Sequence, residues 1–394
     1  MGVGVDMDMD MDTGEGRHGW SAYEITIVAH DIGAVRGMER QLSDLVVGLV
    51  GLGHRVTVIA RMCVLPASVD AGADFHRVRG PSRPFLIAYP WFMLAGSLAV
   101  RRHRRGIVQA TGAIVLNRVD VIAVHYCHQV ATATPSRSTW PFRMHVRLAG
   151  TMKRIGERAC FRRNRSATFV CVSDGLSAEI REHFPALAER VTTIHNGIDT
   201  ERFAPGAHAA EARAMRAALR IPPDRLVVAF VASEWERKGL EPLIRALALT
   251  PDWDLVVAGG GDERRYRELA DAGGVGRRVR WLGVTREVEV VYGLADAFVL
   301  PTDYESFSLV TYEAAASGLP ILATAVNGIR ELIADNQNGF VIDRDPRSIA
   351  HCLQQLAADA PLRRRLGEAA RRSALAFGSQ RMVSEHHELY ERLR

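Results

Sequence analysis

Two spacings of apolar residues alternate along most of the chain, and together they predict repeated β-α units. From Glu24 the apolar run ITIVAH has the length and composition of a buried strand. Apolar residues then recur at helical spacing, at Leu42, Leu45, Val46 and Leu49, before a second apolar run, VTVIA. A strand, a helix and a strand in this order open a parallel, doubly wound sheet, whose ligand crevice lies at the carboxyl ends of the strands.

The same alternation begins again after residue 222, with RLVVAFVASEWERKGL, so the pattern predicts two sheets. The length of 394 residues agrees, because a single hydrophobic core seldom serves so long a chain. Residues 1–23 include the acidic repeat MDMDMD, lack the pattern of a signal peptide and predict a disordered tail. We expect a first domain over residues 24–196, a linker over 197–222, a second domain over 223–377 and a last helix over 378–394.

The most apolar stretch is PFLIAYPWFMLAGSLAV, at residues 84–100. It is at the short limit for crossing a bilayer whose hydrocarbon core is about 30 Å thick, and Pro90 interrupts it. Arginines also bound it on both sides. We therefore predict a core helix of the first domain, with a membrane span as the alternative.

The net charge is +5, and the arginine clusters lie in the first half of the chain. Residues 141–165, PFRMHVRLAGTMKRIGERACFRRNR, carry eight lysines and arginines against one acid, Glu157, with apolar residues at loosely helical spacing. Such a helix can lie on anionic lipid headgroups, and the alternative is a solvated helix whose apolar stripe packs in the core. No helix-turn-helix, zinc-finger or RNP text accompanies the charge, so a membrane surface is favoured over nucleic acid.

The cysteines indicate a reducing compartment. They number five, an odd and scattered set without metal-ligand spacing: Cys63, Cys127, Cys160, Cys171 and Cys352. This argues against a disulfide framework or a zinc site. With the basic helix, it predicts a cytoplasmic protein that is peripherally associated with the inner face of the membrane.

The run VLPTDYESFSLVTYEAAASGLP, at residues 299–320, carries the candidate chemistry. It predicts a buried strand that leads into a helix beginning near Ser308. A helix N-terminus has unpaired N–H groups and roughly half a positive charge, which favour a phosphate. Glu305 precedes this helix and Glu313 lies inside it, so the two carboxylates address different parts of one elongated ligand. Because carboxylates accept hydrogen bonds from sugar hydroxyls, the layout fits a nucleotide sugar.

The spacing of Glu305 and Glu313 resembles the E-x7-E signature of family 4 retaining glycosyltransferases of the GT-B fold. The flanking text, VRWLGVTREVEVVYGLADAFVLPTDYESF and LPILATAVNGIRELIADNQNGFVID, is similar to that family too, and SEWERKGL resembles its lipopolysaccharide core branch. The resemblance implies an α/β chain with two Rossmann-like, doubly wound parallel-sheet domains that face a central cleft. It also implies that the C-terminal helix crosses back to the first domain.

The same resemblance implies roles for residues of the second domain. Lys238 and Arg237 would neutralise the donor diphosphate, Glu305 would hold the sugar and Glu313 the ribose. The start of the helix would contact the phosphates and the end of an earlier strand the base, through Ser306, Phe307, Ser308, Leu309, Leu282, Gly283 and Val284. At 306 and 308 the family often has glycine, so there the serines can add hydroxyl donors instead.

In the first domain, GAVRGMER resembles the glycine-rich loop of the family. Gly37 would let the backbone approach the donor, whereas Arg36 replaces a second glycine and either pairs with phosphate or faces solvent. VDVIAVHYCHQVA predicts a strand followed by His125 and His128. Either histidine matches the active-site histidine of the family, and a histidine that only bonds the strand end is the alternative.

The activity that the resemblance implies is retaining transfer of a hexose-type sugar from a UDP- or GDP-sugar to a glycan or glycolipid acceptor. No cofactor and no metal are expected, and the folded region has no Asp-x-Asp pair after a strand. The alternatives are a sugar-nucleotide epimerase, a transferase for a small soluble acceptor and a non-catalytic binding protein. A dehydrogenase is disfavoured because GGGD, at residues 259–262, does not complete the G-x-G-x-x-G fingerprint.

Overall fold

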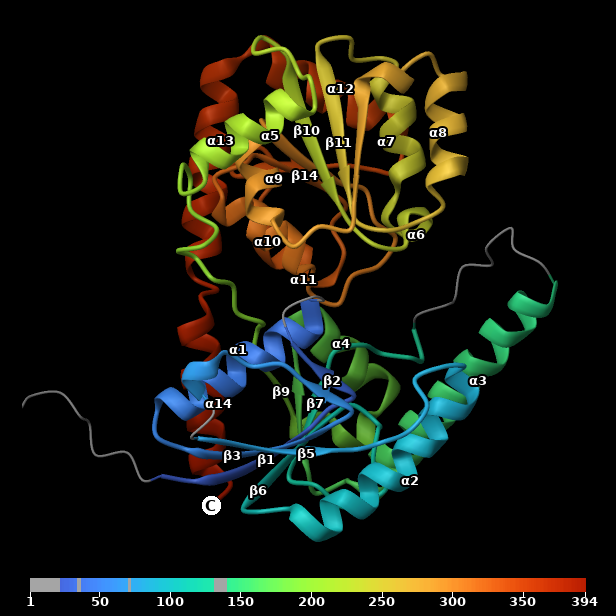
Figure 1. Cartoon of the computed structure of the whole chain (residues 1–394), viewed down its shortest axis with the longest axis vertical. Coiled ribbons are helices and arrows are strands. Elements are labelled where there is room, and N and C mark those ends of the chain that lie inside the picture. Colours follow the sequence, from blue (N-terminus) through green and yellow to red (C-terminus); the bar gives the residue numbers. More distant parts are fainter. Residues whose placement is uncertain (1–21, 34–36, 70–71, 131–139) are drawn as a thin grey trace, which may run out of the picture.

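The computed structural model describes residues 22–33, 37–69, 72–130 and 140–394, which form two domains stacked along the long axis of the molecule (Figure 1). Each domain is built on one large parallel sheet. The predicted α/β fold with two doubly wound parallel sheets is thereby confirmed.

The sheet of the first domain has seven strands in the order β5-β3-β1-β6-β7-β8-β9. Its strands are β1 (Glu24–Val28), β3 (Arg55–Ala60), β5 (Ala73–Arg77), β6 (Ile107–Thr111), β7 (Val121–Val124), β8 (Thr168–Cys171) and β9 (Val191–Thr193). A small parallel pair joins β2 (Asp31–Ile32) to β4 (Met62–Cys63). The helices are α1 (Gly37–Gly51), α2 (Phe85–His103), α3 (Trp140–Arg163) and α4 (Asp174–His183), with short 3-10 turns at Ala67–Val69 and Pro185–Arg190.

The sheet of the second domain has six strands in the order β12-β11-β10-β13-β14-β15. They are β10 (Leu226–Val231), β11 (Trp253–Ala258), β12 (Val279–Gly283), β13 (Ala297–Leu300), β14 (Ile321–Ala323) and β15 (Gly339–Val341). The helices are α5 (Ala209–Ala218), α6 (Trp235–Lys238), α7 (Leu240–Leu247), α8 (Glu263–Ala272), α9 (Val288–Leu294), α10 (Leu309–Ala316), α11 (Asn327–Leu332), α12 (Pro346–Ala358) and α13 (Ala360–Leu375), with a 3-10 turn at Gly276–Arg278. Helix α14 (Ser379–Arg392) ends the chain.

The continuous apolar runs of the sequence became the central strands. Strands β11 and β13 are buried along their whole length, and β10 along all but its first residue. Parallel strands that are covered on both faces by helices require such runs, because neither face meets water.

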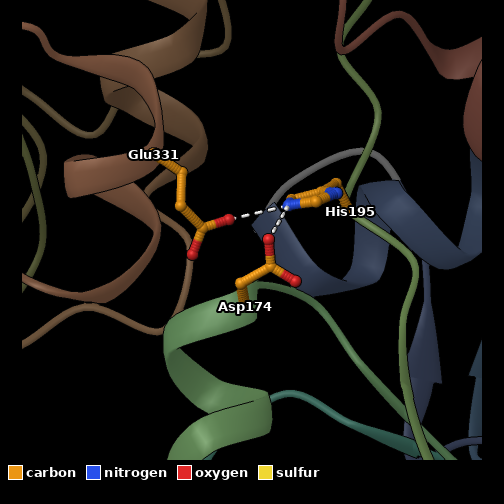
Figure 2. Close-up of side chains that lie close together, drawn as sticks. All are labelled: Asp174, His195 and Glu331. Atoms are coloured by element: carbon orange, nitrogen blue, oxygen red, sulfur yellow. Dashed lines mark hydrogen bonds and ion pairs between the residues drawn. The ribbon is translucent and has the colours of Figure 1, made fainter.

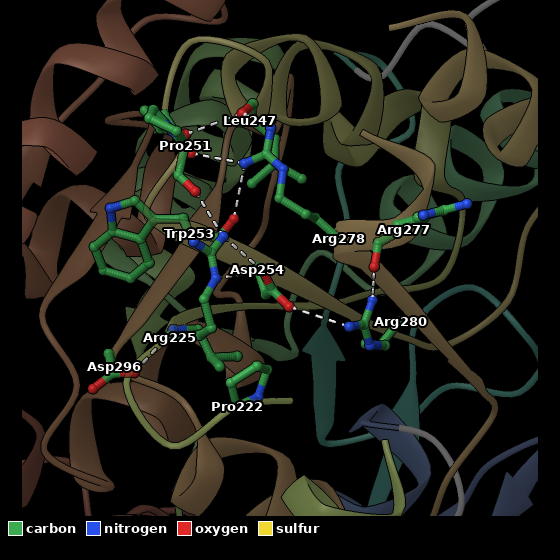
Figure 3. A network of polar contacts seen from close by, with 12 residues as sticks. Pro222, Arg225, Leu247, Pro251, Trp253, Asp254, Arg277, Arg278, Arg280 and Asp296 are labelled. Carbon is green, nitrogen blue, oxygen red and sulfur yellow. Dashed lines mark hydrogen bonds and ion pairs between the residues drawn. The ribbon is translucent and has the colours of Figure 1, made fainter. Parts of the chain in front are cut away.

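A buried carboxylate, Asp254 on β11, ties the second sheet together (Figure 3). Its Oδ1 accepts hydrogen bonds from Arg225, just before β10, and its Oδ2 accepts one from Arg280 on β12. Arg278 donates to main-chain carbonyls nearby, including that of Trp253. These contacts lie near the amino ends of β10 and β11, so the opposite, carboxyl ends remain available to the cleft.

The chain passes between the domains at two places, and the two crossings are bonded to each other. The N–H of Ile198 donates to the carbonyl of Phe377 at 2.9 Å, and the N–H of Ser379 donates to the carbonyl of Ile198 at 3.0 Å. Beyond the second crossing, α14 runs along the first domain beside α1 (Figure 1). There Tyr390 donates a buried hydrogen bond of 2.8 Å to Gln109 of β6, so the C-terminal helix returns to the first domain as expected.

The most apolar stretch forms α2, and only one face of this helix is buried. Tyr89 and Phe92 pack into the first domain, whereas Ile87, Trp91 and Leu94 are exposed. The predicted core helix is therefore an amphipathic surface helix. Within the ranges that the structure describes, no helix has both the length and the apolar character needed to cross a membrane.

Candidate active site

A cavity of about 240 Å³ opens between the domains at the carboxyl ends of both sheets. It brings together many of the residues predicted from sequence. The first domain contributes Gly37, Met38, His125, Val172 and Asn196, and the second contributes Lys238, Glu305, Ser306, Phe307, Ser308, Leu309 and Val310. A ligand in this cavity would contact both domains at once.

The start of α10 forms one wall of the cavity. Ser308 is its N-cap residue and has left-handed backbone angles, φ 79° and ψ 63°, which residues other than glycine seldom adopt. Its hydroxyl pairs with that of Thr311 at 2.8 Å. The first turn of a helix has N–H groups without partners in the helix, and here that turn faces the cavity through Leu309 and Val310. The wall therefore has the features of an anion site, and phosphate binding there stays a prediction.

A second wall carries an ion pair between Lys238 and Glu305. The side chains are 13% and 9% exposed, so neither charge is well hydrated. The close approach of the α6 end to the end of β13 depends on Gly239, whose φ is 82°, because a Cβ there would lie 2.1 Å from the carbonyl oxygen of Pro301. The short helix α6 thus delivers Lys238 directly beside the end of β13. Charge of both signs is available to a ligand, the ammonium for phosphate and the carboxylate for hydroxyls.

Arg237 has a different position from its neighbour Lys238. Its guanidinium donates to Glu234 at 2.9 and 2.6 Å and to the carbonyl of Tyr304 at 2.5 Å. Arg237 is not among the residues that line the cavity. In this arrangement it supports the loop before α10, while Lys238 faces the candidate donor site.

The two candidate histidines are separated by the structure. His125 lines the cavity, and burial lowers its pKa to about 4, so the ring is neutral near pH 7. Among the described residues no group bonds its Nε2. His128 does not line the cavity; its ring packs on Tyr126, and burial, followed by Lys153 and Arg154, lowers its pKa to about 4. The geometry therefore favours His125 as the histidine that meets a ligand.

Glu313 faces a second cavity, of about 370 Å³, on the other side of α10 from Glu305. Its Oε1 lies 2.7 Å from the Arg40 guanidinium of α1, and Tyr292 donates to its Oε2 at 3.3 Å. Burial raises the pKa of Glu313, and Arg40 opposes the rise. Burial likewise raises the pKa of Asp44, in the same cavity, to about 6. The two glutamates thus line different cavities, and their binding to two parts of one ligand stays a prediction.

Arg40 is a site residue that the sequence prediction did not include. It lies three residues after Gly37, in the text GMER, and that position next to the glycine-rich loop was the available signal. Gly37 itself approaches α10 closely, since a Cβ there would lie 3.0 Å from Leu309. Arg36 lies outside the described residues.

The proposed base-binding residues lie apart from both cavities. Leu282, Gly283 and Val284 mark the end of β12, and none of them lines either cavity. The carbonyl of Gly283 already accepts a hydrogen bond of 2.7 Å from the N–H of Gly259. Val284 is exposed.

Polar contacts close the domain interface beside the first cavity. Glu179 of α4 accepts hydrogen bonds from Tyr304 at 2.9 Å and from Asn327 at 2.8 Å. Ser173, the N-cap residue of α4, donates to the carbonyl of Ser306 at 2.6 Å. The loop that carries Glu305 is therefore held by the first domain as well as by its own.

The same interface contains a cluster of metal-ligand types, Asp174, His195 and Glu331, whose candidate ligand atoms lie within 4.8 Å of one another (Figure 2). His195 Nε2 is 2.7 Å from Glu331, and its Nδ1 is 3.5 Å from the guanidinium of Arg381. A guanidinium only donates, so it favours the tautomer in which Nδ1 accepts and Nε2–H donates to Glu331. That tautomer leaves no lone pair on Nε2 for a metal, and the cluster serves as an interdomain polar contact.

Comparisons with known proteins agree with the fold. The family described as "Glycosyltransferase Family 4" matches residues 35–202, and the family described as "Glycosyl transferases group 1" matches residues 211–373. A D-inositol 3-phosphate glycosyltransferase of Corynebacterium urealyticum is 33% identical over 236 residues, which are 56% of this chain and 55% of that protein. The chain thus matches about half the length of this curated relative.

Solved structures show the same architecture over nearly the whole chain. WaaG, a glycosyltransferase involved in lipopolysaccharide biosynthesis, is 22% identical with a TM-score of 0.77, over 93% of this chain and 99% of WaaG. HepE of Anabaena, solved in complex with UDP and glucose, is 17% identical with a TM-score of 0.71, over 94% of this chain and 99% of HepE. At these identities the likeness establishes the fold.

Proposed function

The chain belongs to the family 4 glycosyltransferases of the GT-B fold, and on that premise we propose that it transfers a hexose-type sugar from a nucleoside diphosphate sugar to an acceptor. The observation that carries the proposal is the interdomain cavity. Lys238, Glu305, His125 and the first turn of α10 converge there. A cation, a helix N-terminus and a carboxylate in one space suit a ligand with phosphates at one end and hydroxyls at the other.

The diphosphate would lie against the first turn of α10 with the Lys238 ammonium beside it. As the bond between the anomeric carbon and the phosphate oxygen breaks, negative charge grows on the leaving diphosphate. Lys238 and the N–H groups of α10 are in place before this happens, and removing one such preorganised donor typically costs about 3 kcal/mol of barrier. The Lys238–Glu305 ion pair would open to admit the donor, which frees the carboxylate for sugar hydroxyls.

His125 would act as a neutral hydrogen-bonding group at the sugar. Its lowered pKa keeps it uncharged at neutral pH, its Nε2 has no hydrogen-bond partner among the described residues, and the residue lines the cavity. A neutral imidazole can bond a hydroxyl without repelling the positive charge that develops at the anomeric carbon. Glu313, with Arg40 beside it, would hold the ribose on the other side of α10.

We further propose that transfer retains the anomeric configuration and requires no metal. Retention follows the resemblance of the Glu305 and Glu313 spacing to the family signature. Metal independence is supported by the protein's own positive charge at the phosphate position, from Lys238 and the start of α10. A UDP-sugar is the first donor to test, since the structurally similar HepE binds UDP.

For the acceptor we propose a glycan or glycolipid at the cytoplasmic face of the membrane. The basic helix α3 supports this location, because Arg143, Arg147 and Arg158 are exposed and can contact anionic headgroups. A second candidate is a small soluble polyol phosphate. The observation that favours it is the relative that acts on D-inositol 3-phosphate, which matches 56% of this chain.

A two-step experiment tests the proposal. A thermal-shift panel of UDP- and GDP-sugars should identify a donor, since a ligand at 100 times its Kd stabilises a protein by about 2.7 kcal/mol. The labelled donor is then incubated with cytoplasmic-leaflet lipids, glycans or inositol phosphate, and the product is analysed by mass. Label in a new acceptor is the expected result. Conversion of the donor sugar without an acceptor would establish the epimerase instead, and no response to any nucleotide sugar would reject the site.

A further inference from the structure

The outer face of α2 carries an unbroken apolar stripe. Ile87, Trp91, Leu94 and Leu98 are 58%, 50%, 64% and 50% exposed. Their spacings of four, three and four residues place them on one side of the helix, opposite the buried Tyr89 and its neighbours. A surface helix of a globular protein normally presents polar residues on this side, so the stripe has an uncommon composition.

The neighbouring helix α3 has the same property. Of the 18 large apolar side chains that are exposed among the described residues, eight belong to α2 and α3. Those on α3 are Trp140, Met144, Leu148 and Ile155, at spacings of four, four and seven. The helices lie side by side at one end of the first domain (Figure 1), and Lys153 of α3 lies over the ring of Phe85 of α2. Nearly half of the exposed large apolar side chains in the described part of the chain therefore lie on these two adjacent helices.

Positive charge surrounds this region, and exposed negative charge is missing from both helices. Exposed arginines lie before α2, in its last turn and directly after it, namely Arg79, Arg83, Arg101, Arg102, Arg104 and Arg105. Helix α2 contains no acid, and the single acid of α3, Glu157, is buried. A second copy of this face would bring like charges together, which disfavours self-association. An anionic, apolar partner meets both requirements.

We propose that α2 is an insertion element, whose apolar stripe enters the boundary between the headgroups and acyl chains of an anionic bilayer while the flanking arginines contact the headgroups. The inference rests on the proposed membrane location and goes beyond it, since that location was argued from the charge of α3 alone. A helix with one apolar face and cationic flanks binds in the plane of the interface, to a depth of about 5–10 Å. The donor cavity then remains in the water layer next to the lipid surface.

Vesicle flotation with the full chain tests the proposal, using vesicles of neutral lipid and vesicles containing acidic phospholipid. The insertion variant is Ile87→Ser, Leu94→Ser, Leu98→Ser. Trp91 is kept because its Nε1 donates to the carbonyl of Arg79 at 3.0 Å. The matched control is Leu249→Ser, Val341→Ser, Leu375→Ser, three exposed apolar residues of the second domain. A charge variant is Arg143→Glu, Arg147→Glu, Arg158→Glu.

We expect the wild type and the control to bind acidic vesicles and the insertion variant to bind at least tenfold more weakly. Brominated acyl chains should quench tryptophan fluorescence in the wild type and the control but not in the insertion variant. Quenching that is unchanged by the three serines, or equal vesicle binding, would overturn the role of α2 and leave the α3 proposal standing. Absence of wild-type binding to all vesicles would reject the membrane location itself, while a retained thermal shift with nucleotide sugar would preserve the donor site.

Two further outcomes identify other occupants. Self-association of the wild type without lipid, measured by analytical ultracentrifugation and lost in the insertion variant, would show that the stripe is an interface between copies. Wild-type binding that ignores lipid charge would show that the arginines do not select the surface. Either result would overturn the proposed anionic bilayer as the partner.

Discussion

Replacing Arg40 by methionine should destabilise the protein in a way that depends on pH. In the wild type the guanidinium lies 2.7 Å from Glu313, whose side chain is 4% exposed. The variant keeps the aliphatic stem but leaves a buried carboxylate with one neutral partner, the Tyr292 hydroxyl. Removing one member of a buried ion pair typically costs 3–5 kcal/mol. Arg40 is partly exposed, so we expect about 3 kcal/mol near pH 8.

The sign of the pH effect follows from the pKa of Glu313. Burial already raises this pKa, and loss of Arg40 removes the opposing influence, so in the variant it rises further. A carboxyl whose folded pKa is raised above its unfolded pKa destabilises the folded state increasingly as pH rises from the unfolded pKa to the folded pKa, and has no such effect well below the unfolded pKa. At about pH 5 the variant carboxyl is protonated, and the loss should fall to about 1 kcal/mol or less.

Neighbouring groups act in the same direction, and a second variant separates them. Burial raises the pKa of Asp44 to about 6 against the opposing effect of Arg40, so the loss of Arg40 should raise the pKa values of both Asp44 and Glu313. Arg202 still lowers both pKa values in the variant. Asp199 and Glu289 complete the charged surroundings. In the double variant Arg40→Met, Glu313→Gln the carboxylate is absent, so most of the lost stability should return and only the smaller Asp44 effect should depend on pH.

Urea unfolding followed by circular dichroism, at about pH 8 and about pH 5, measures these differences as shifts of the midpoint at constant slope. Each variant is compared with the wild type at the same pH, so that other titrating groups cancel. An equal loss at both pH values, or a double variant as unstable as Arg40→Met, would refute the reasoning.

Three other predictions concern separate features. Lys238→Met should weaken binding of the identified nucleotide sugar at least tenfold, as measured by calorimetry. The control Arg245→Met, on the exposed side of the adjacent α7, should leave this binding unchanged. Equal affinities of the two variants would show that Lys238 does not belong to the donor site. Transfer should proceed at the full rate in excess EDTA, and rescue by manganese or magnesium alone would disprove metal independence. Arg220→Gly should raise the free energy of unfolding by about 0.5–1 kcal/mol, since Arg220 directly follows the C-cap residue of α5 and has a φ of 55°. Arg213→Gly, inside that helix, should lower the free energy of unfolding by about 1 kcal/mol.

The order of strands and helices was predictable because the apolar pattern of each segment indicates whether that segment is buried. The apolar run before Pro301 predicts a strand that is buried on both faces, and Glu305 follows shortly after the carboxyl end of that strand. The joint position of Lys238 and Glu305 was also accessible, since both follow strands whose carboxyl ends share one edge of the sheet. Local pattern and sheet topology together therefore gave one wall of the candidate site.

Other features depend on contacts between segments that are distant in the sequence, and on which way each side chain faces. Arg40 and Glu313 are 273 residues apart and belong to different domains, and no spacing rule joins them. Arg237 and Lys238 are adjacent, yet only Lys238 reaches the cavity, because the turn at Gly239 fixes which side of α6 faces β13. His125 and His128 are equivalent by composition, and the path of the chain after β7 separates them. Composition likewise hid the exposed face of α2, since an apolar run does not say which neighbours will cover it.

The paired crossings at Ile198 and Phe377 have a mechanical consequence. Two separate tethers would let the domains twist, slide and swing independently, whereas two segments bonded side by side act as a short ribbon. A ribbon flexes readily across its flat face and resists shear within its plane. Substrate exchange would then require a swing of one domain about that ribbon, and the interdomain contacts of Glu179, Ser173, His195 and Arg40 are among those that must break. Because the domains would open and close about one axis, each closure would bring the side chains of the two domains back to the same relative positions.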